Sequence, residues 1–293
     1  MAQQDYSDFL KQLYGVKVQK LNVNAGFTCP NRDGTLGAGG CTYCNNVSFT
    51  PAFTRASKSV TQQLLDAKQF YAGKYASMKY LAYFQSFTGT YAPVDKLQEL
   101  YEEALSVPDV VGLVVSTRPD CLSDEILSLL GDIDKHHRVI VELGVETTHD
   151  RTLKLINRCH SWQYAKNAIN KTAERGLVVG AHMILGLPGE TIDDMLASVK
   201  TIAQLPLNSI KFHQLQVLKG TRLAKQWESG EVKLINWTPQ EYATLCHQVL
   251  ELLPGNIFVE RMVSTAPSSM LLYPKWNLKP AQFKNLFDQI FYN

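Results

Sequence analysis

The chain has 293 residues, of which 45% are hydrophobic and 19% are charged, a composition typical of a globular protein with one large α/β domain or two smaller ones. Its formal net charge of +2 neither requires nor excludes a nucleic-acid partner. The first residues are polar and acidic, unlike a signal peptide, and no apolar run is as long as a membrane span, so we expect a cytoplasmic protein without a membrane partner. In that compartment the six cysteines are expected to be reduced thiols.

Short apolar stretches alternate with amphipathic segments over the first three quarters of the chain. We expect a helix at residues 5–14, a strand at residues 16–23, and then a loop rich in glycine and cysteine. Five more strands are predicted, at residues 80–84, 110–115, 139–145, 177–185 and 209–218. Helices are predicted between them, at residues 60–71, 94–104, 123–131 and 161–175 and from Thr191 onward. Continuously apolar strands that alternate with helices indicate parallel βαβ units, which form either an open sheet or a barrel.

The last quarter of the chain does not continue this alternation. A capping box at Thr238–Glu241 predicts a helix that runs to about residue 253, and Pro280 begins a terminal amphipathic helix. Residues 257–262 are a candidate for a marginal seventh strand. Because no linker precedes this region, we expect residues 221–293 to be an extension packed on the domain formed by residues 1–220.

Three cysteines, Cys29, Cys41 and Cys44, lie close together in the loop after the first predicted strand. A Cys-x-x-Cys pair can place two thiolates on one metal ion or cluster, and the glycines before it allow the backbone to bring Cys29 back to the pair. The segment has no fourth cysteine and no histidine, and the open coordination position indicates chemistry more than structural stabilisation. A structural zinc site that uses a distant histidine is the alternative. The other cysteines are expected to be small buried hydrophobic residues: Cys121, Cys159 and Cys246.

Polar side chains gather where the predicted strands end. In parallel α/β folds, ligands bind beyond the carboxyl ends of the strands, so these side chains are candidates for a binding site. They lie at Gln85–Gly89, Ser116–Asp120, Glu142–Glu146 and His182–Glu190. The last strand is rich in polar residues that would be costly to bury in a dry core and are expected to face a wet cavity. Together with two later cations, these are candidates for substrate contact: His213, Gln214, Gln216, Arg261 and Lys275.

The sequence resembles the radical SAM proteins of the small bacterial type related to the catalytic subunit of Elongator, the YhcC-like group. The resemblance extends over most of the chain and is carried by segments that follow successive predicted strands: 26–34, 40–45, 116–120, 141–146, 157–160, 182–190 and 218–221. The first cysteine spacing is longer than the one commonest in the superfamily, although long spacings occur in this branch. The resemblance implies an α/β fold, a partial (β/α)6 barrel of the TIM type with a C-terminal helical extension.

The resemblance also implies the cofactors. Cys29, Cys41 and Cys44 would bind three irons of a [4Fe-4S] cluster, and S-adenosylmethionine would occupy the open iron. Reductive cleavage of S-adenosylmethionine would generate a 5′-deoxyadenosyl radical that abstracts hydrogen from a substrate. Tyr43 would flank the adenine, and Arg158 would meet the methionyl carboxylate. The full set of implied contacts to S-adenosylmethionine is Tyr43, Gln85, Ser86, Thr88, Thr117, Glu142, Arg158, His182 and Leu218.

Elongator-like relatives act on the wobble uridine of tRNA, so the resemblance further implies a tRNA substrate, along with an external electron donor. A basic rim near the cluster would support tRNA binding, and its candidate members are Lys17, Lys20, Arg32, Arg55 and Lys58. A radical SAM enzyme that acts on a peptide or a small metabolite is one alternative. A non-catalytic, zinc-stapled binding protein is another.

Overall fold

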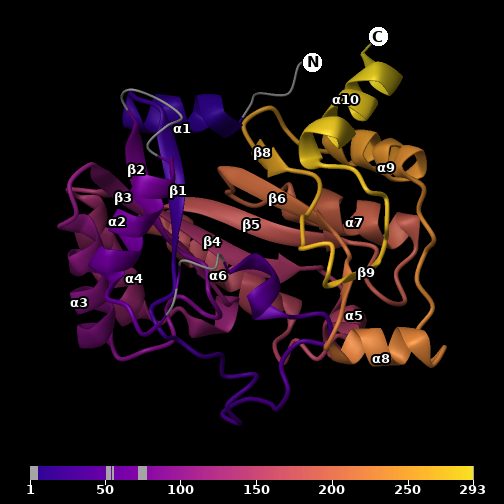
Figure 1. The fold of residues 1–293 in the computed structure, drawn as a ribbon, viewed down its shortest axis with the longest axis horizontal. Coiled ribbons are helices and arrows are strands. Elements are labelled where there is room, and N and C mark those ends of the chain that lie inside the picture. Colours follow the sequence, from indigo (N-terminus) through magenta and orange to yellow (C-terminus); the bar gives the residue numbers. More distant parts are fainter. Residues whose placement is uncertain (1–5, 51–53, 55, 72–77, 293) are drawn as a thin grey trace.

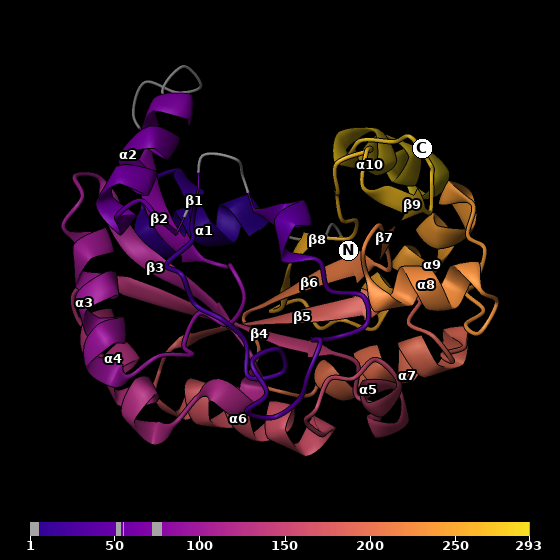
Figure 2. The same ribbon diagram turned by 60° about the horizontal axis from the view of Figure 1, so that its bottom comes forward.

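A computed structural model of the chain describes residues 6–50, 54, 56–71 and 78–292. Seven strands form one sheet in which every neighbouring pair is parallel (Figure 1). They lie in chain order: β1 (Val18–Val23), β2 (Lys79–Phe84), β3 (Val110–Thr117), β4 (Arg138–Glu146), β5 (Val178–Leu185), β6 (Ser209–Gln214) and β8 (Phe258–Arg261). The sheet is curled (Figure 2), but no backbone ladder joins β1 to β8 in the described residues. The fold is therefore the predicted partial TIM-type barrel, and the marginal seventh strand is confirmed as β8.

Helices run around the outside of the curled sheet (Figure 2). They are α2 (Val60–Tyr71), α3 (Val94–Leu105), α4 (Asp124–Asp134), α6 (Trp162–Glu174), α7 (Ile192–Ile202) and α9 (Pro239–Glu251). The terminal helix α10 (Pro280–Phe291) packs on α9 and confirms the predicted C-terminal helices. Shorter elements lie in the connections: η1 (Asn46–Phe49), η2 (Pro119–Cys121), α5 (Asp150–Leu155), α8 (Arg222–Glu228) and an antiparallel pair, β7 (Val217–Leu218) with β9 (Leu271–Tyr273).

The inside of the barrel is built in layers, because every second residue of a strand faces inward. The deepest layer is apolar, and α1 (Tyr6–Tyr14) fills it from the gap between β1 and β8 (Figure 2). Its buried members include Phe9, Leu81, Val114, Ile140 and Val178. The inward residues nearer the strand ends are polar, which leaves the carboxyl end of the barrel free for a binding site.

Two sequence predictions differ from the structure in detail, and two short helices were missed. Gly131 lies within α4 and does not end it, because the helix continues to Asp134. The last predicted strand, 209–218, is interrupted after Gln214, and Val217–Leu218 turns away to pair with β9. The short helices α5 and α8 were not predicted, since neither is long enough to show a clear periodicity. No helix of the described chain is long and apolar enough to cross a membrane.

Candidate functional site

A cavity of about 220 Å³ opens at the carboxyl ends of the strands, and all three loop cysteines line it. The strands place further side chains in its wall by their alternation. In β5, for example, His182 and Ile184 are two residues apart and both line the cavity. The cavity therefore lies where the polar residues at the strand ends predicted a binding site.

Backbone hydrogen bonds fix the cysteine loop. The amides of Arg32 and Asp33 donate to the carbonyl of Cys29 at 2.7 and 3.2 Å, and the amide of Cys44 donates to the carbonyl of Cys41 at 3.1 Å. Gly40 has a φ of +77°, and a Cβ atom there would lie 2.9 Å from the Arg32 side chain. Glycine is therefore required at position 40 both for the backbone angle and for the space that Arg32 occupies.

The three loop cysteines are the candidate ligands of a metal or cluster. No group of three or more His, Cys, Asp or Glu side chains in the described residues could hold one metal ion. The three cysteines nevertheless line the same cavity. In an iron–sulfur cluster each thiolate binds a different iron, whereas all ligands of a zinc ion lie about 2 Å from one centre. Three cysteines on one cavity are the ligand set that a cluster with one open iron needs.

Cationic and amide donors surround the cysteine sulfurs. Arg158 donates from Nη1 to Sγ of Cys41 at 3.5 Å, and Nδ2 of Asn31 lies 3.6 Å from the same sulfur. Arg32 donates from Nη2 to the carbonyl of Cys44 at 2.9 Å. Burial, with the neighbouring Cys41, raises the pKa of the Cys44 thiol to about 11, so a bound metal is what would make this sulfur a thiolate near neutral pH. These donors suit the negative charge of an iron–sulfur cluster.

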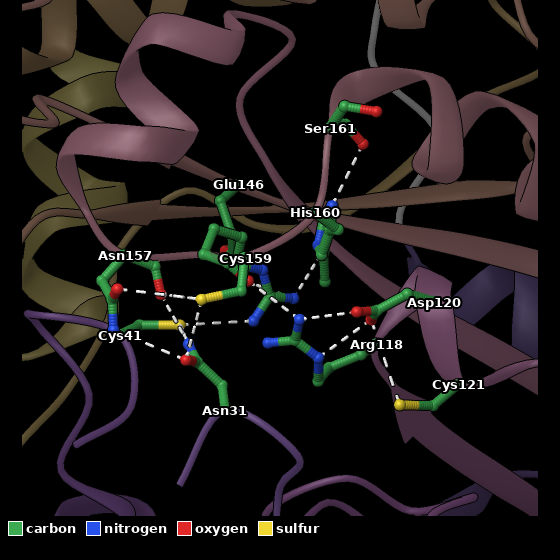
Figure 3. A network of polar contacts seen from close by, with 12 residues as sticks. Asn31, Cys41, Arg118, Asp120, Cys121, Glu146, Asn157, Cys159, His160 and Ser161 are labelled. Carbon is green, nitrogen blue, oxygen red and sulfur yellow. Dashed lines mark hydrogen bonds and ion pairs between the residues drawn. The ribbon is translucent and has the colours of Figure 1, made fainter. Parts of the chain in front are cut away.

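Two buried arginines form the polar network of Figure 3 beside Cys41. Arg118 donates to both carboxylate oxygens of Asp120, at 2.9 and 2.8 Å, and to the carbonyl of Arg158 at 2.8 Å. Arg158 in turn donates from Nη2 to the carbonyl of Gly144 at 2.5 Å and lies 3.4 Å from Glu146. Nη1 of Arg118 and Nε of Arg158 are buried without a hydrogen-bond partner in the described residues. Each arginine therefore keeps a donor for a ligand.

Beneath the cavity lies a layer of buried charges. Nζ of Lys20 is 2.6 Å from Oε1 of Glu142 and 2.7 Å from Oε2 of Glu260. Nζ of Lys211 lies 3.1 Å from Oε2 of Glu142 and 3.0 Å from Oε1 of Glu260. His182 connects this layer to the cavity, because it lines the cavity while its Nε2 is 2.8 Å from Oε2 of Glu142. Burial opposes the charge of Glu142, but Lys20 and Lys211 outweigh it and hold the pKa of its carboxyl well below the usual range.

Seven of the nine residues predicted to contact S-adenosylmethionine line the cavity: Tyr43, Gln85, Thr88, Thr117, Arg158, His182 and Leu218. Ser86 and Glu142 do not line it. Ser86 is buried and does not line the cavity, and the carboxylate of Glu142 is held in the charged layer below.

Among the substrate candidates, Lys275 does not line the cavity, whereas the others do: His213, Gln214, Gln216 and Arg261. Arg32 and Arg118 line the cavity without having been predicted to contact a cofactor.

The expected basic rim is wrong in part. Lys20 points into the charged layer and is only 12% exposed. Lys58 pairs with Asp66 at 2.5 Å, and its place on the rim stays a prediction. Arg32 lines the cavity beside the cysteines, and Arg55 lies outside the described residues. Lysines spaced along a sequence do not show which face they share, so this prediction had only a weak basis.

The three remaining cysteines were expected to be buried, and this holds fully only for Cys246. Cys121 is half-buried, and Cys159 is exposed. Cys159 has a φ of +62° and its sulfur lies 3.1 Å from Oδ1 of Asn31, so the turn after α5 presents it at the surface of the cysteine loop. The expectation failed for Cys159 because a lone cysteine in sequence carries no information about such a turn.

Comparison with known families identifies the class of protein to which this barrel belongs. Residues 27–202 match the family model of the Radical SAM superfamily, and residues 207–291 match the Radical_SAM C-terminal domain. The chain belongs to the radical SAM superfamily. This superfamily uses a [4Fe-4S] cluster and S-adenosylmethionine, and the chain is accordingly a radical SAM enzyme with these cofactors.

Several proteins are similar to this chain. YtqA of Bacillus subtilis is 38% identical over 92% of this chain and 83% of its own length, and YhcC of Escherichia coli K12 is 38% identical over 91% and 85%. A protein of Methanocaldococcus infernus named tRNA uridine(34) acetyltransferase is 28% identical over 55% of this chain but only 30% of its own length. The structure of Elp3 from the same archaeon, with an N-terminal deletion, superposes with a TM-score of 0.70 at 19% identity, over 93% of this chain and 62% of that one.

Proposed function

We propose that Cys29, Cys41 and Cys44 hold the [4Fe-4S] cluster and that S-adenosylmethionine binds in the cavity beside it. The residues present fit this cofactor, because all three cysteines line one cavity, among arginine and amide donors. A cluster held there would, once reduced, supply the one electron needed to split the C5′–S bond of S-adenosylmethionine into methionine and a 5′-deoxyadenosyl radical.

The chain's own residues would bind and orient S-adenosylmethionine. Nε of Arg158 and Nη1 of Arg118, both buried and without a partner in the described residues, would receive the methionyl carboxylate. The hydroxyl of Thr88 is likewise buried without a partner and would accept a hydrogen bond from the methionyl amino group. Tyr43 and Leu218 line the cavity where an adenine ring would pack.

Thr117, Gln85 and His182 also line the cavity, although Thr117 already shares a hydrogen bond of 2.6 Å with Thr90. We propose that they meet the ribose or the edge of the substrate. No role with S-adenosylmethionine is proposed for Ser86 or Glu142, since neither lines the cavity.

The convergence of the three cysteines on one cavity carries this proposal, and cysteine variants test it. After anaerobic reconstitution, the parent chain is expected to bind about four irons and to form 5′-deoxyadenosine when reduced. Replacing Cys29, Cys41 or Cys44 with serine should abolish both. The matched control is Cys159→Ser, which removes an exposed thiol that does not line the cavity and should leave both intact. A colourless protein with one zinc would refute the proposal and favour the zinc-stapled alternative.

For the substrate, we propose the base side chain of a tRNA uridine. The support is the likeness to proteins named tRNA uridine(34) acetyltransferase, of whose length the chain spans about a third or less. Nucleoside analysis of tRNA from a strain that lacks this gene tests the proposal, and loss of one modified uridine is expected. Binding of tRNA by the purified protein should also weaken steeply with salt. Unchanged tRNA nucleosides with an altered peptide or metabolite would place the enzyme in the alternative substrate class and leave its radical chemistry standing. An external one-electron donor is a further part of the proposal.

A further inference from the structure

The register between β6 and β8 contains a β-bulge at the rim of the cavity. Ile210 pairs with Val259 and Lys211 pairs with Arg261, so Glu260 is an extra residue on β8. In a regular strand, two successive side chains point to opposite faces. Here both side chains lie on the inner side of the sheet. Glu260 contacts the two lysines of the charged layer, and Arg261 lines the cavity above that layer. The bulge thus directs an additional cation into the cavity.

Arg261 differs from the other cavity arginines in its partners. Arg118 pairs with Asp120, Arg158 lies beside Glu146, and Arg32 faces the cysteine loop. The carboxylate next to Arg261, that of Glu260, is held by two lysines of the charged layer. Nε of Arg261 is buried and has no hydrogen-bond partner within the described residues. A guanidinium in this situation keeps its charge and has an unsatisfied N–H donor that an anion could accept from.

His213 fixes the orientation of this guanidinium. Nη2 of Arg261 lies 3.2 Å from Nδ1 of His213, and the hydroxyl of Ser264 lies 2.7 Å from the same nitrogen. A guanidinium can only donate, so Nδ1 must accept and the ring proton lies on Nε2. Burial, Arg261 and His182 together hold the pKa of His213 well below the usual range, so the ring stays neutral. His213 therefore positions Arg261 without neutralising it.

The loop after β8 is also held in place. Nε2 of Gln214 donates to the carbonyl of Ser264 at 3.2 Å, and its Oε1 accepts from the backbone amide of the same residue. Gln216 adds a bond of 3.4 Å to that carbonyl. The two glutamines that the sequence offered as substrate contacts thus use their amides to hold the rim. Of the substrate candidates that line the cavity, Arg261 is the one that carries a charge.

We propose that Arg261 binds an oxyanion of the substrate, a carboxylate or a phosphate group, at the β6–β8 end of the cavity. Two parallel N–H bonds from the guanidinium edge match two oxygens of such a group. The methionyl carboxylate of S-adenosylmethionine is assigned to Arg158 beside β4, and β5 and β6 lie between that strand and β8. This inference deepens the proposed function, on which it rests for the use of the cavity as the substrate site.

Equilibrium dialysis with two probes, radiolabelled inorganic phosphate and radiolabelled acetate, tests the proposal on the anaerobically reconstituted protein saturated with S-adenosylmethionine. We expect one anion to bind per chain. Arg261→Gln should weaken binding by about 10- to 100-fold, the loss typical of a charge-assisted pair of hydrogen bonds. Arg261→Lys keeps the positive charge but loses the two parallel N–H donors of the guanidinium, and it should bind the anion with intermediate affinity. Arg175→Gln, which removes the same charge from an exposed position, should bind like the parent.

Preference for phosphate would indicate a nucleotide substrate, and preference for acetate would indicate a carboxylate substrate; either supports the proposal. Equal anion binding by the parent and Arg261→Gln, or binding of neither probe by the parent, would overturn it. Iron content and binding of S-adenosylmethionine are measured on the same samples, so a failure of the cofactor assignment is seen separately. Circular dichroism checks that each variant is folded. Selenate soaked into crystals gives a second readout, with an anomalous peak expected beside Arg261.

Discussion

Lys20 and Glu260 belong to the two edge strands of the open sheet, yet Nζ of Lys20 lies 2.7 Å from Oε2 of Glu260. A side-chain ion pair therefore joins β1 to β8 where no backbone ladder does in the described residues. Lys20 also contacts Glu142 on β4 at 2.6 Å, across the inside of the barrel. This charged layer forms the floor of the cavity. His182 contacts Glu142 of the layer and also lines the cavity, so the ion pairs that join the edge strands also position a side chain of the site.

The first prediction concerns the stability that depends on this layer. Lys20→Met should lower the free energy of unfolding by about 3–5 kcal/mol, because it leaves two carboxylates buried with fewer cations. Lys58→Met is the control: it breaks a partly exposed pair with Asp66 and should cost about 0–1 kcal/mol. Urea denaturation of both variants measures the difference. A cost for Lys20→Met no larger than that for the control would show that the layer does not stabilise the barrel.

The second prediction is a dependence of stability on pH. Burial, with Arg158 nearby, lowers the pKa of His160 to about 3 from an ordinary value of 6.5. The imidazole of His160 binds a proton more readily in the unfolded chain than in the folded one. Its contribution to the free energy of unfolding is therefore present above pH 6.5 and is lost as pH falls toward 3, by about 1.4 kcal/mol per pH unit.

Urea titrations between pH 7 and pH 5 measure this slope in the parent and in His160→Gln. The variant should have the shallower dependence, whatever its stability at pH 7, because it no longer carries the titrating ring. Identical slopes would mean that His160 titrates in the folded protein as it does in the unfolded chain.

The third prediction concerns the space that holds Arg158. A Cβ atom at Gly144 would lie 2.6 Å from Nη2 of Arg158 and 2.8 Å from Oε1 of Glu146. Gly144→Ala should displace the guanidinium and weaken binding of S-adenosylmethionine by about tenfold, or ~1.4 kcal/mol. Gly131→Ala is the matched control, since nothing lies within 4 Å of its added Cβ, and it should stabilise α4 by about 0.5–1 kcal/mol without affecting binding. Isothermal titration of the reconstituted proteins gives both affinities, and equal values would argue against the assignment of Arg158.

The sequence sufficed for the parallel sheet and for the convergence of the three cysteines on one cavity, because strand and helix periodicity and a short cysteine spacing are local features. That these cysteines hold the cluster stays a prediction. It misplaced Glu142, whose partners Lys20, Lys211 and Glu260 come from strands that are distant in sequence. Arg261 was named from the sequence as a candidate for substrate contact and lines the cavity, but the bulge that turns it inward could not be predicted. A bulge is a property of the register between two strands, and period-2 alternation alone would have put Glu260 and Arg261 on opposite faces.

The most direct test of the account is the electron paramagnetic resonance spectrum of the reduced, reconstituted protein, recorded before and after addition of S-adenosylmethionine. Three cysteine ligands leave one iron open, so the account predicts a [4Fe-4S]⁺ signal whose g-values shift when S-adenosylmethionine binds that iron. A cluster signal that does not change on addition, or a protein that binds no iron at all, would contradict it.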